Sequence, residues 1–121
     1  SLLRGVDMSE CLFCKIVEKK IPAKLVHEDE DTLAFDDIHP QAPVHTLVIP
    51  KRHVGSVQDL GEADQALLAR LLLTCRKVAN DKGLAGSGFR LVANTGRDGG
   101  QTVFHLHFHV MGGRPMGWPP G

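Results

Sequence analysis

Three histidines alternate with apolar residues near the end of the chain, in the stretch Phe104-His105-Leu106-His107-Phe108-His109-Val110. Successive side chains of a strand point to opposite faces, so this spacing predicts a strand over residues 103–110, with the three imidazoles on one face and four apolar groups on the other. Histidine occupies 7 of 121 positions, and chance would produce ~0.02 such alternations in a chain of this composition. An exposed polar face on an edge strand is the alternative, but Lys, Thr or Glu would serve equally well there.

Imidazoles that lie within reach of one ligand support two kinds of chemistry. One is a metal ion held by several histidines. The other is nucleophilic and acid–base chemistry, because the unperturbed pKa of imidazole is about 6.5 and the neutral ring is abundant at neutral pH. The alternation alone does not decide between them.

The rest of the chain predicts a single α+β domain. Its 121 residues, 42% of them apolar, are enough for one core without disulfides. We expect a short helix over 12–18, and a long helix over 62–82 that ends at Gly83. The long helix has apolar residues at three- and four-residue spacing, namely Leu67, Leu68, Leu71, Leu72, Cys75, Val78 and Ala79.

Strands are expected between and after the two helices, over residues 25–28, 32–36, 45–49 and 89–93. A Gly-rich turn over 96–100 separates the last of these from the histidine strand. Because strands and helices do not alternate regularly, we expect a mainly antiparallel five-stranded sheet crossed by the long helix. We expect residues 1–10 to be a disordered or vector-derived extension and 11–121 to form the domain.

Composition and charge exclude several classes of protein. Fourteen basic residues balance fourteen acidic ones and no basic run occurs, which disfavours a nucleic-acid grip. The longest apolar stretch, 67–73, is interrupted by Arg70 and is far shorter than the ~20 residues of a membrane span. The first seven residues lack the features of a secretory signal, so we expect a cytoplasmic protein that associates with neither membranes nor nucleic acid.

Cysteine spacing suggests a metal site. Cys11 and Cys14 form a CxxC pair, whose two thiolates reach one ion but supply only half of a tetrahedral site. A redox pair is disfavoured because no strand of a βαβ unit precedes Cys11, and reduced, unligated thiols remain the simpler alternative. Cys75 lies on the apolar stripe of the long helix and is expected in the core.

The stretch from His105 to Met111 resembles the histidine triad motif, and the tail Trp118-Pro119-Pro120-Gly121 resembles the C-terminal signature of the Hint branch of that superfamily. Further similarity in order and spacing occurs at 21–24, 35–43, 45–50 and 99–103, so the resemblance covers residues 11–121. It implies the HIT-like fold, binding of a purine nucleoside monophosphate or phosphoramidate, and hydrolysis of the P–N bond of nucleoside 5′-phosphoramidates. It also implies a homodimer.

The resemblance implies a role for each matching residue. His107 would attack phosphorus and form a nucleotidyl-histidine, His109 would donate to a phosphate oxygen, and His45 would help to relay a proton to the departing amine. Asp37 would accept hydrogen bonds from the ribose hydroxyls, with an acidic turn residue as the alternative. The phosphate would be surrounded by Asn94, Gln101, Thr102 and Gly100, beside which main-chain N–H groups come close.

Two further groups are implied by the same resemblance. A set of apolar residues would line the base pocket, although each of them is equally compatible with ordinary core: Phe13, Ile16, Ile21, Phe35 and Ile38. His53 and His105 match the positions that complete a zinc site with the cysteine pair in bacterial Hint-like proteins. Such a closed four-ligand Zn²⁺ site would be structural, and catalysis would need no cofactor.

The sequence disfavours two other enzymatic functions and one binding function. Dinucleoside polyphosphate hydrolysis, as in the Fhit branch, is disfavoured by the Hint-like tail. Nucleotidyl transfer to a sugar phosphate is disfavoured because that family has glutamine where His109 stands. A nucleotide sensor or scaffold without turnover is disfavoured by the intact triad.

Overall fold

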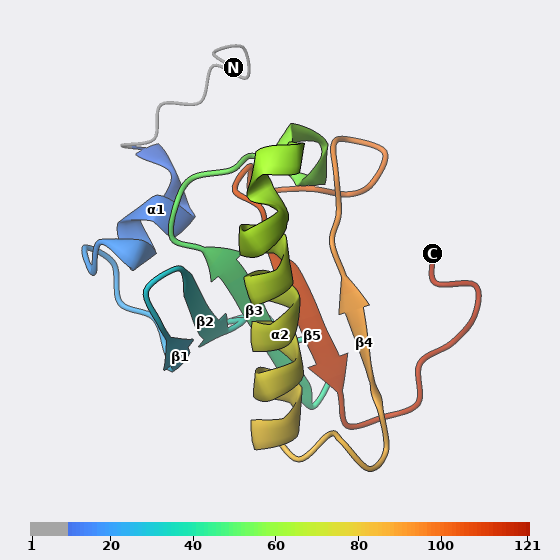
Figure 1. The fold of residues 1–121 in the computed structure, drawn as a ribbon. Coiled ribbons are helices and arrows are strands. Elements are labelled where there is room, and N and C mark those ends of the chain that lie inside the picture. Colours follow the sequence, from blue (N-terminus) through green and yellow to red (C-terminus); the bar gives the residue numbers. More distant parts are fainter. Residues whose placement is uncertain (1–9) are drawn as a thin grey trace.

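The computed structural model describes residues 10–121, so the expected N-terminal extension lies outside the described residues except for Glu10. A five-stranded antiparallel sheet forms the centre of the fold, with strand order β1-β2-β3-β5-β4 (Figure 1). The strands are β1 (Leu25–Glu28), β2 (Thr32–Asp36), β3 (Val44–Pro50), β4 (Phe89–Val92) and β5 (Phe108–Gly112). The predicted α+β class and antiparallel sheet are confirmed.

Two α-helices and two single 3₁₀ turns within residues 11–121 complete the fold. Helix α1 (Leu12–Val17) is short, and α2 (Gln65–Asp81) crosses one face of the sheet (Figure 1). The 3₁₀ turns η3 (Val57–Asp59) and η4 (Glu62–Asp64) lead into α2, so the predicted helix begins three residues later than expected. No helix within residues 10–121 combines the length and apolar content that crossing a membrane requires.

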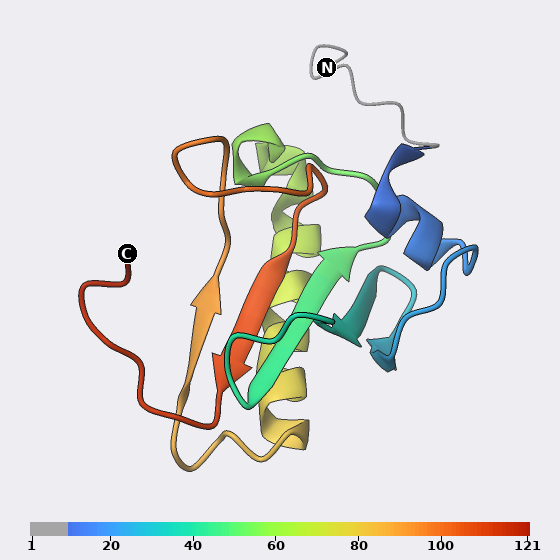
Figure 2. The same cartoon turned by 180° about the vertical axis from the view of Figure 1, so that it is seen from behind.

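Alternate residues of the central strands pack into two different cores. Ala34 and Val48 belong to the core under α2, whereas their neighbours Leu33, Leu47 and Ile49 belong to a second core beside α1. This period of two is what a sheet covered on both faces requires. Figure 2 shows the sheet from the face opposite α2, with α1 beside the end of β3.

The apolar stripe predicted on α2 is correct except at one position. Leu71, Cys75, Val78 and Ala79 are buried against the sheet, but Leu72 is 42% exposed. Thr74 is buried in its place, where its hydroxyl lies 3.2 Å from that of Thr32. The hydroxyl pair satisfies both polar groups, which explains why a polar residue is tolerated in this core.

The histidine strand is shorter than predicted. β5 begins at Phe108, and residues 103–107 are irregular, so His105 and His107 precede the strand. The ladder with β3 reaches only to the pair Val48 and Phe108, because Pro50 has no N–H to continue it. The two-faced arrangement survives: Leu106, Phe108 and Val110 enter the α2 core, while Phe104 is 46% exposed.

Candidate functional site

Three imidazoles gather on the sheet face opposite α2. His109 lies on β5 directly across from Leu47 of β3, and His45 lies two residues before Leu47, so the two rings are diagonal neighbours on one face. The ring centroids of His45 and His109 are 5.1 Å apart, and those of His107 and His109 are 5.0 Å apart. The structure therefore brings together the three residues predicted to be catalytic.

The hydrogen bond of His107 determines which of its ring nitrogens carries the proton. Its Nδ1 lies 2.7 Å from the carbonyl oxygen of His105, and a carbonyl only accepts, so Nδ1 carries hydrogen and Nε2 keeps a lone pair. Burial lowers the pKa of His107 despite the opposing effects of this bond and of Asp37, which favours the neutral ring. Phe13 packs edge-on against the ring at 5.2 Å. A neutral imidazole with a free Nε2 lone pair is a competent nucleophile.

A chain of hydrogen bonds orients the other two rings. The backbone N–H of Gln41 donates to Nδ1 of His45 over 3.0 Å, so in its neutral form His45 carries its proton on Nε2. That nitrogen lies 2.8 Å from Nδ1 of His109 and donates to it, which leaves the proton of His109 on Nε2. Among residues 10–121, this Nε2 is a fully buried side-chain nitrogen with no hydrogen-bond partner.

Burial also keeps these two rings uncharged. It lowers the pKa of His109 to about 4, with the neighbouring His107 and His45 acting in the same direction and Asp37 opposing them. It lowers the pKa of His45 as well, again against the carboxylate of Asp37. At neutral pH, His109 therefore keeps a neutral, buried N–H donor for which no other group within residues 10–121 is an acceptor.

Asp37 lies beside the histidines at the end of β2. Its Oδ2 is 3.5 Å from Nε2 of His45, and its Oδ1 accepts a hydrogen bond from the backbone N–H of His39 over 2.8 Å. The second contact is an Asx turn, which is the alternative foreseen from the sequence. Oδ2 faces the histidine cluster and is available to a ligand as an acceptor.

The residues expected around a phosphate have different environments. The side chain of Gln101 is committed to its own loop: Nε2 donates to the carbonyls of Gly55 (2.8 Å) and Val103 (3.0 Å), and Oε1 accepts from the N–H of Gly96 (2.9 Å). Both amide hydrogens are used within the loop, so Gln101 braces the loop in this structure, and its contact with a phosphate stays a prediction.

The remaining predicted phosphate residues are accessible. Thr102 and Gly100 are exposed, and Gly100 has φ +84°, a conformation that favours glycine. Asn94 is half-buried two residues beyond Val92, the β4 partner of His109. It lines a groove of about 530 Å³ between β4 and the segment that follows β5.

The predicted base-pocket residues differ in burial, and their role in a base pocket stays a prediction. Phe13, Ile16 and Phe35 are buried in the core beside α1, with Ile21 packed partly against it. Ile38 is 84% exposed, so it contributes nothing to that core. The alternative foreseen from the sequence, ordinary core, describes the first three, and Phe13 alone among them is in aromatic contact with His107.

A second cluster of predicted residues lies next to the imidazole group. The thiols of Cys11 and Cys14 and one ring nitrogen each of His53 and His105 all lie within 4.8 Å of one another. Sγ of Cys11 is 3.4 Å from Nδ1 of His105, and Sγ of Cys14 is 3.3 Å from Nδ1 of His53 and 3.6 Å from Nδ1 of His105. Tetrahedral zinc with its usual bond lengths separates sulfur and nitrogen ligands by about 3.5 Å, so the donor set fits that ion.

The surroundings of this cluster suit a cation. His105 is fully buried, and its Nε2 donates to the carbonyl oxygen of Pro50 over 2.9 Å, so its Nδ1 lone pair faces the thiols. Burial, followed by the adjacent Cys11, raises the pKa of the Cys14 thiol to about 12. Two thiolates placed side by side need a positive charge between them, which a divalent metal supplies.

Some contributors to the site escaped the sequence analysis because backbone atoms provide the contact. The N–H of Gln41 and the carbonyls of Pro50 and His105 set the proton positions on three rings. The sequence motif identifies the histidine rings, but it does not identify the peptide groups that form hydrogen bonds with them. Arg114, whose side chain donates to the carbonyl oxygen of Gln41, also has no recognisable signal in the sequence.

Comparison with known proteins shows to which family a chain with these two clusters belongs. A model of the HIT domain matches residues 18–116. The chain belongs to the HIT domain family. Cys11 and Cys14 precede the matched region, so the thiol half of the second cluster lies outside what that model describes.

Relatives of the HIT family match nearly the whole chain. An uncharacterized HIT-like protein of Synechocystis is 52% identical over 112 residues, which cover 93% of this chain and 97% of that protein. The crystal structure of a HIT family hydrolase from Legionella pneumophila superposes with a TM-score of 0.91 at 51% identity, covering 93% of this chain and all of that one. A histidine triad protein from Clostridium difficile superposes with a TM-score of 0.88 at 39% identity, and the match covers 93% of this chain and 97% of that one. These matches confirm the HIT fold.

Proposed function

We propose that this HIT protein hydrolyses the P–N bond of purine nucleoside 5′-phosphoramidates through a nucleotidyl-histidine intermediate. One observation carries the proposal: the free Nε2 lone pair of His107 stands next to the buried, unpartnered N–H of His109. A nucleophile beside a donor suits attack on a phosphoryl group, whose oxygens gain charge in the transition state. The resemblance to the Hint branch and the similarity to a HIT family hydrolase support the same reaction class.

In the first step, Nε2 of His107 forms a bond to phosphorus as the P–N bond to the amine breaks. His109 donates a hydrogen bond from its Nε2–H to a phosphate oxygen and stabilises the developing charge. The amine departs with one added proton, which comes from solvent through the hydrogen-bonded rings of His45 and His109, and both rings are neutral before and after the step. His107 keeps its Nδ1 hydrogen bond to the His105 carbonyl throughout, so the ring stays oriented.

In the second step, water attacks phosphorus and the bond to His107 breaks. The water oxygen remains on the nucleoside monophosphate with one of its hydrogens, and the other hydrogen replaces the proton that was given to the amine. Over both steps one water molecule is consumed, and an amine and a nucleoside monophosphate are released. Splitting the displacement lets one site expel an amine and then admit water.

Nucleotide recognition is assigned to the accessible groups around the histidines. We assign the ribose hydroxyls to Oδ2 of Asp37, the phosphate to Thr102, Asn94 and the main chain near Gly100, and one edge of the base pocket to Phe13. The cysteine–histidine cluster would hold zinc in a structural role. With four protein ligands it leaves no position for water, so it takes no part in the steps above.

A comparison of two substrates tests the proposed reaction. We expect kcat/KM for adenosine 5′-phosphoramidate to exceed that for diadenosine triphosphate at least ~100-fold, which is about 2.7 kcal/mol of transition-state free energy. Initial rates with each substrate at equal enzyme concentration measure it. The opposite preference would favour the dinucleoside polyphosphate hydrolase, and nucleotide binding without turnover of either substrate would favour the sensor.

A homodimer joined along β4 is also proposed. β4 is an edge strand of the sheet, and its Phe89 and Leu91 are 39% and 37% exposed. An edge strand with apolar exposed side chains is suited to pairing with a second copy. Light scattering at micromolar concentration should give twice the mass of one chain for the wild type. The Leu91→Glu variant should give the mass of a single chain. Val57→Glu alters an equally exposed residue on η3 and should leave the dimer intact; a monomeric wild type would contradict the proposal.

A further inference from the structure

Arg114 ties the segment that follows β5 to the loop that precedes β3. Its Nη2 donates to the carbonyl oxygen of Gln41 over 2.9 Å, and its Nη1 donates to the carbonyl of Pro115 over 3.1 Å. Next to it, Gly113 has φ +93°, and a Cβ there would lie 2.8 Å from Cβ of Pro43. Both segments lie at the same end of the sheet, where β5 ends and β3 begins (Figure 2).

The residue that Arg114 contacts is the one that orients His45. The carbonyl of Gln41 accepts from Arg114, and its N–H donates to Nδ1 of His45 over 3.0 Å. The Gln41 side chain donates to the carbonyl of His39 over 3.0 Å, which holds the loop from the other side. Because both peptide groups flanking Gln41 are engaged, a rotation of this residue would break the bond to His45.

The bond to His45 decides what His109 offers to a ligand. With Nδ1 of His45 occupied as an acceptor, Nε2 donates to Nδ1 of His109, whose own Nε2 is then a donor. If the Gln41 N–H moved away, His45 could carry its proton on Nδ1 and present a lone pair to His109. His109 would then donate back to His45, and its buried Nε2 would face a phosphate oxygen as a second acceptor, which is repulsive.

We propose that Arg114 is a positioning residue, which holds Gln41 so that His45 and His109 stay in the proton arrangement that presents a donor to the phosphate. The inference rests on the proposed phosphoramidase function and adds to it a residue that lies outside the histidine cluster. Arg114 is exposed and touches no ring directly; it acts through one peptide group.

Replacing Arg114 with Ala tests the inference through kinetics. We expect kcat for adenosine 5′-phosphoramidate to fall roughly 10- to 100-fold, as misorientation of catalytic groups does, while KM changes less than about 3-fold. Arg114→Lys keeps one donor for the Gln41 carbonyl and should recover part of kcat. Circular dichroism of both variants confirms that each is folded.

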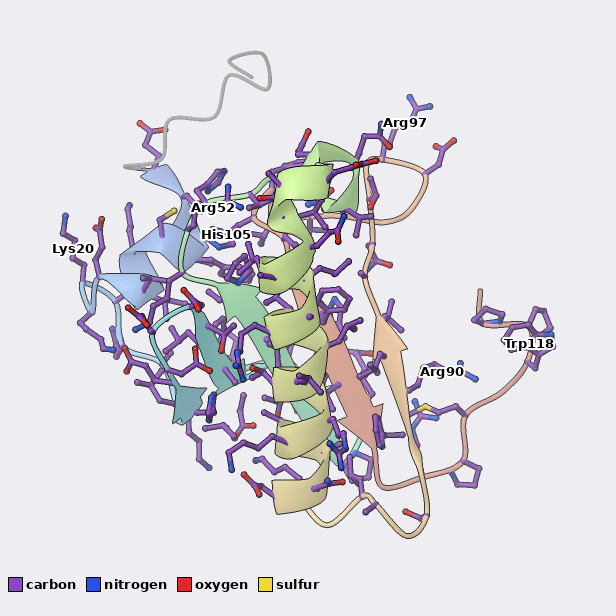
Figure 3. All side chains as sticks on the ribbon, viewed as in Figure 1. Lys20, Arg52, Arg90, Arg97, His105 and Trp118 are labelled. Atoms are coloured by element: carbon purple, nitrogen blue, oxygen red, sulfur yellow. The ribbon has the colours of Figure 1, made fainter. Side chains whose placement is uncertain are left out.

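Arg90→Ala is the matched control. Arg90 also anchors the segment after β5, donating to the carbonyl of Gly117 over 2.7 Å, but it does not contact the Gln41 loop. Figure 3 shows it extending from β4 toward that segment, on the side where Trp118 lies. Its loss should leave kcat within about 2-fold of wild type, because the tail is loosened without freeing Gln41.

A direct measurement of the proton positions separates this inference from the proposed function. In long-range ¹H–¹⁵N NMR spectra, His45 of the wild type should show the Nε2–H form, and Arg114→Ala should shift it toward Nδ1–H. An unchanged His45 signal, or an unchanged kcat, in Arg114→Ala would overturn the inference. A wild type that shows the expected His45 form but does not cleave phosphoramidates would overturn the proposed function instead.

Discussion

Replacing His107 with Asn is expected to lower kcat/KM for adenosine 5′-phosphoramidate by at least ~10⁴-fold, the size of effect seen when a nucleophile is removed. The amide of Asn is able to donate to the His105 carbonyl in place of Nδ1, so the fold and the local hydrogen bond are preserved. What disappears is the Nε2 lone pair. The loss should therefore fall on kcat, with nucleotide binding retained.

Intact-mass analysis of enzyme quenched during turnover checks the same residue directly. The wild type should carry one added nucleoside monophosphate, and His107→Asn should carry none. His27→Asn is the control, since His27 pairs with Asp29 at 2.9 Å on β1 and the turn after it, and takes no part in the site. A His107→Asn enzyme that still forms the adduct would show that another residue attacks phosphorus.

Removing the metal that we propose for the cysteine–histidine cluster is the second change for which we expect a large effect. A metal present at 1,000 times its dissociation constant stabilises the folded state by about 4 kcal/mol, which for a domain of this size is a Tm difference of roughly 10–20 °C. We therefore expect a strong chelator, or Cys14→Ser, to lower Tm by that amount. Calorimetry with elemental analysis of zinc per chain measures both quantities.

Cys75→Ala separates metal loss from loss of a thiol. Cys75 is buried in the α2 core and has no part in the cluster, so its variant should lose some stability but keep its zinc and its response to the chelator. A wild type whose Tm does not respond to the chelator and whose zinc content is negligible would mean that the four residues hold no metal.

The sheet and both helices were predictable because their signals are local. The period of two around His109 and the three- and four-residue spacing around Leu71 follow from strand and helix geometry. The start of β5 was not predictable, because it depends on Pro50. This residue lies on β3 and has no N–H to donate to the ladder with β5. Residue 72 was assigned to the core because spacing alone does not reveal that Thr74 has a hydroxyl partner on β2.

The residues of the site also fall into those that a local sequence pattern reveals and those that depend on the folded structure. The triad could be recognised from its own alternation, and the thiol pair from its spacing, whereas His53 was identified only by resemblance. The bracing role of Gln101 could not be predicted, because two of its partners are carbonyl oxygens whose positions depend on the folded loop. The Arg114 contact joins residues 73 positions apart through a main-chain oxygen, so no side-chain pattern in the sequence marks it.

His105 joins the two clusters within one residue. Its ring faces the thiols of Cys11 and Cys14, and its main-chain oxygen accepts a hydrogen bond from Nδ1–H of His107. A change at Cys11 or Cys14 that moves His105 would therefore also change the orientation of the His107 ring, two positions further along the backbone, without replacing any residue assigned to the nucleotide. A chain of this fold without the two cysteines would therefore have to fix residue 105 by other contacts, and the packing around the His105 ring is where compensating substitutions would be found.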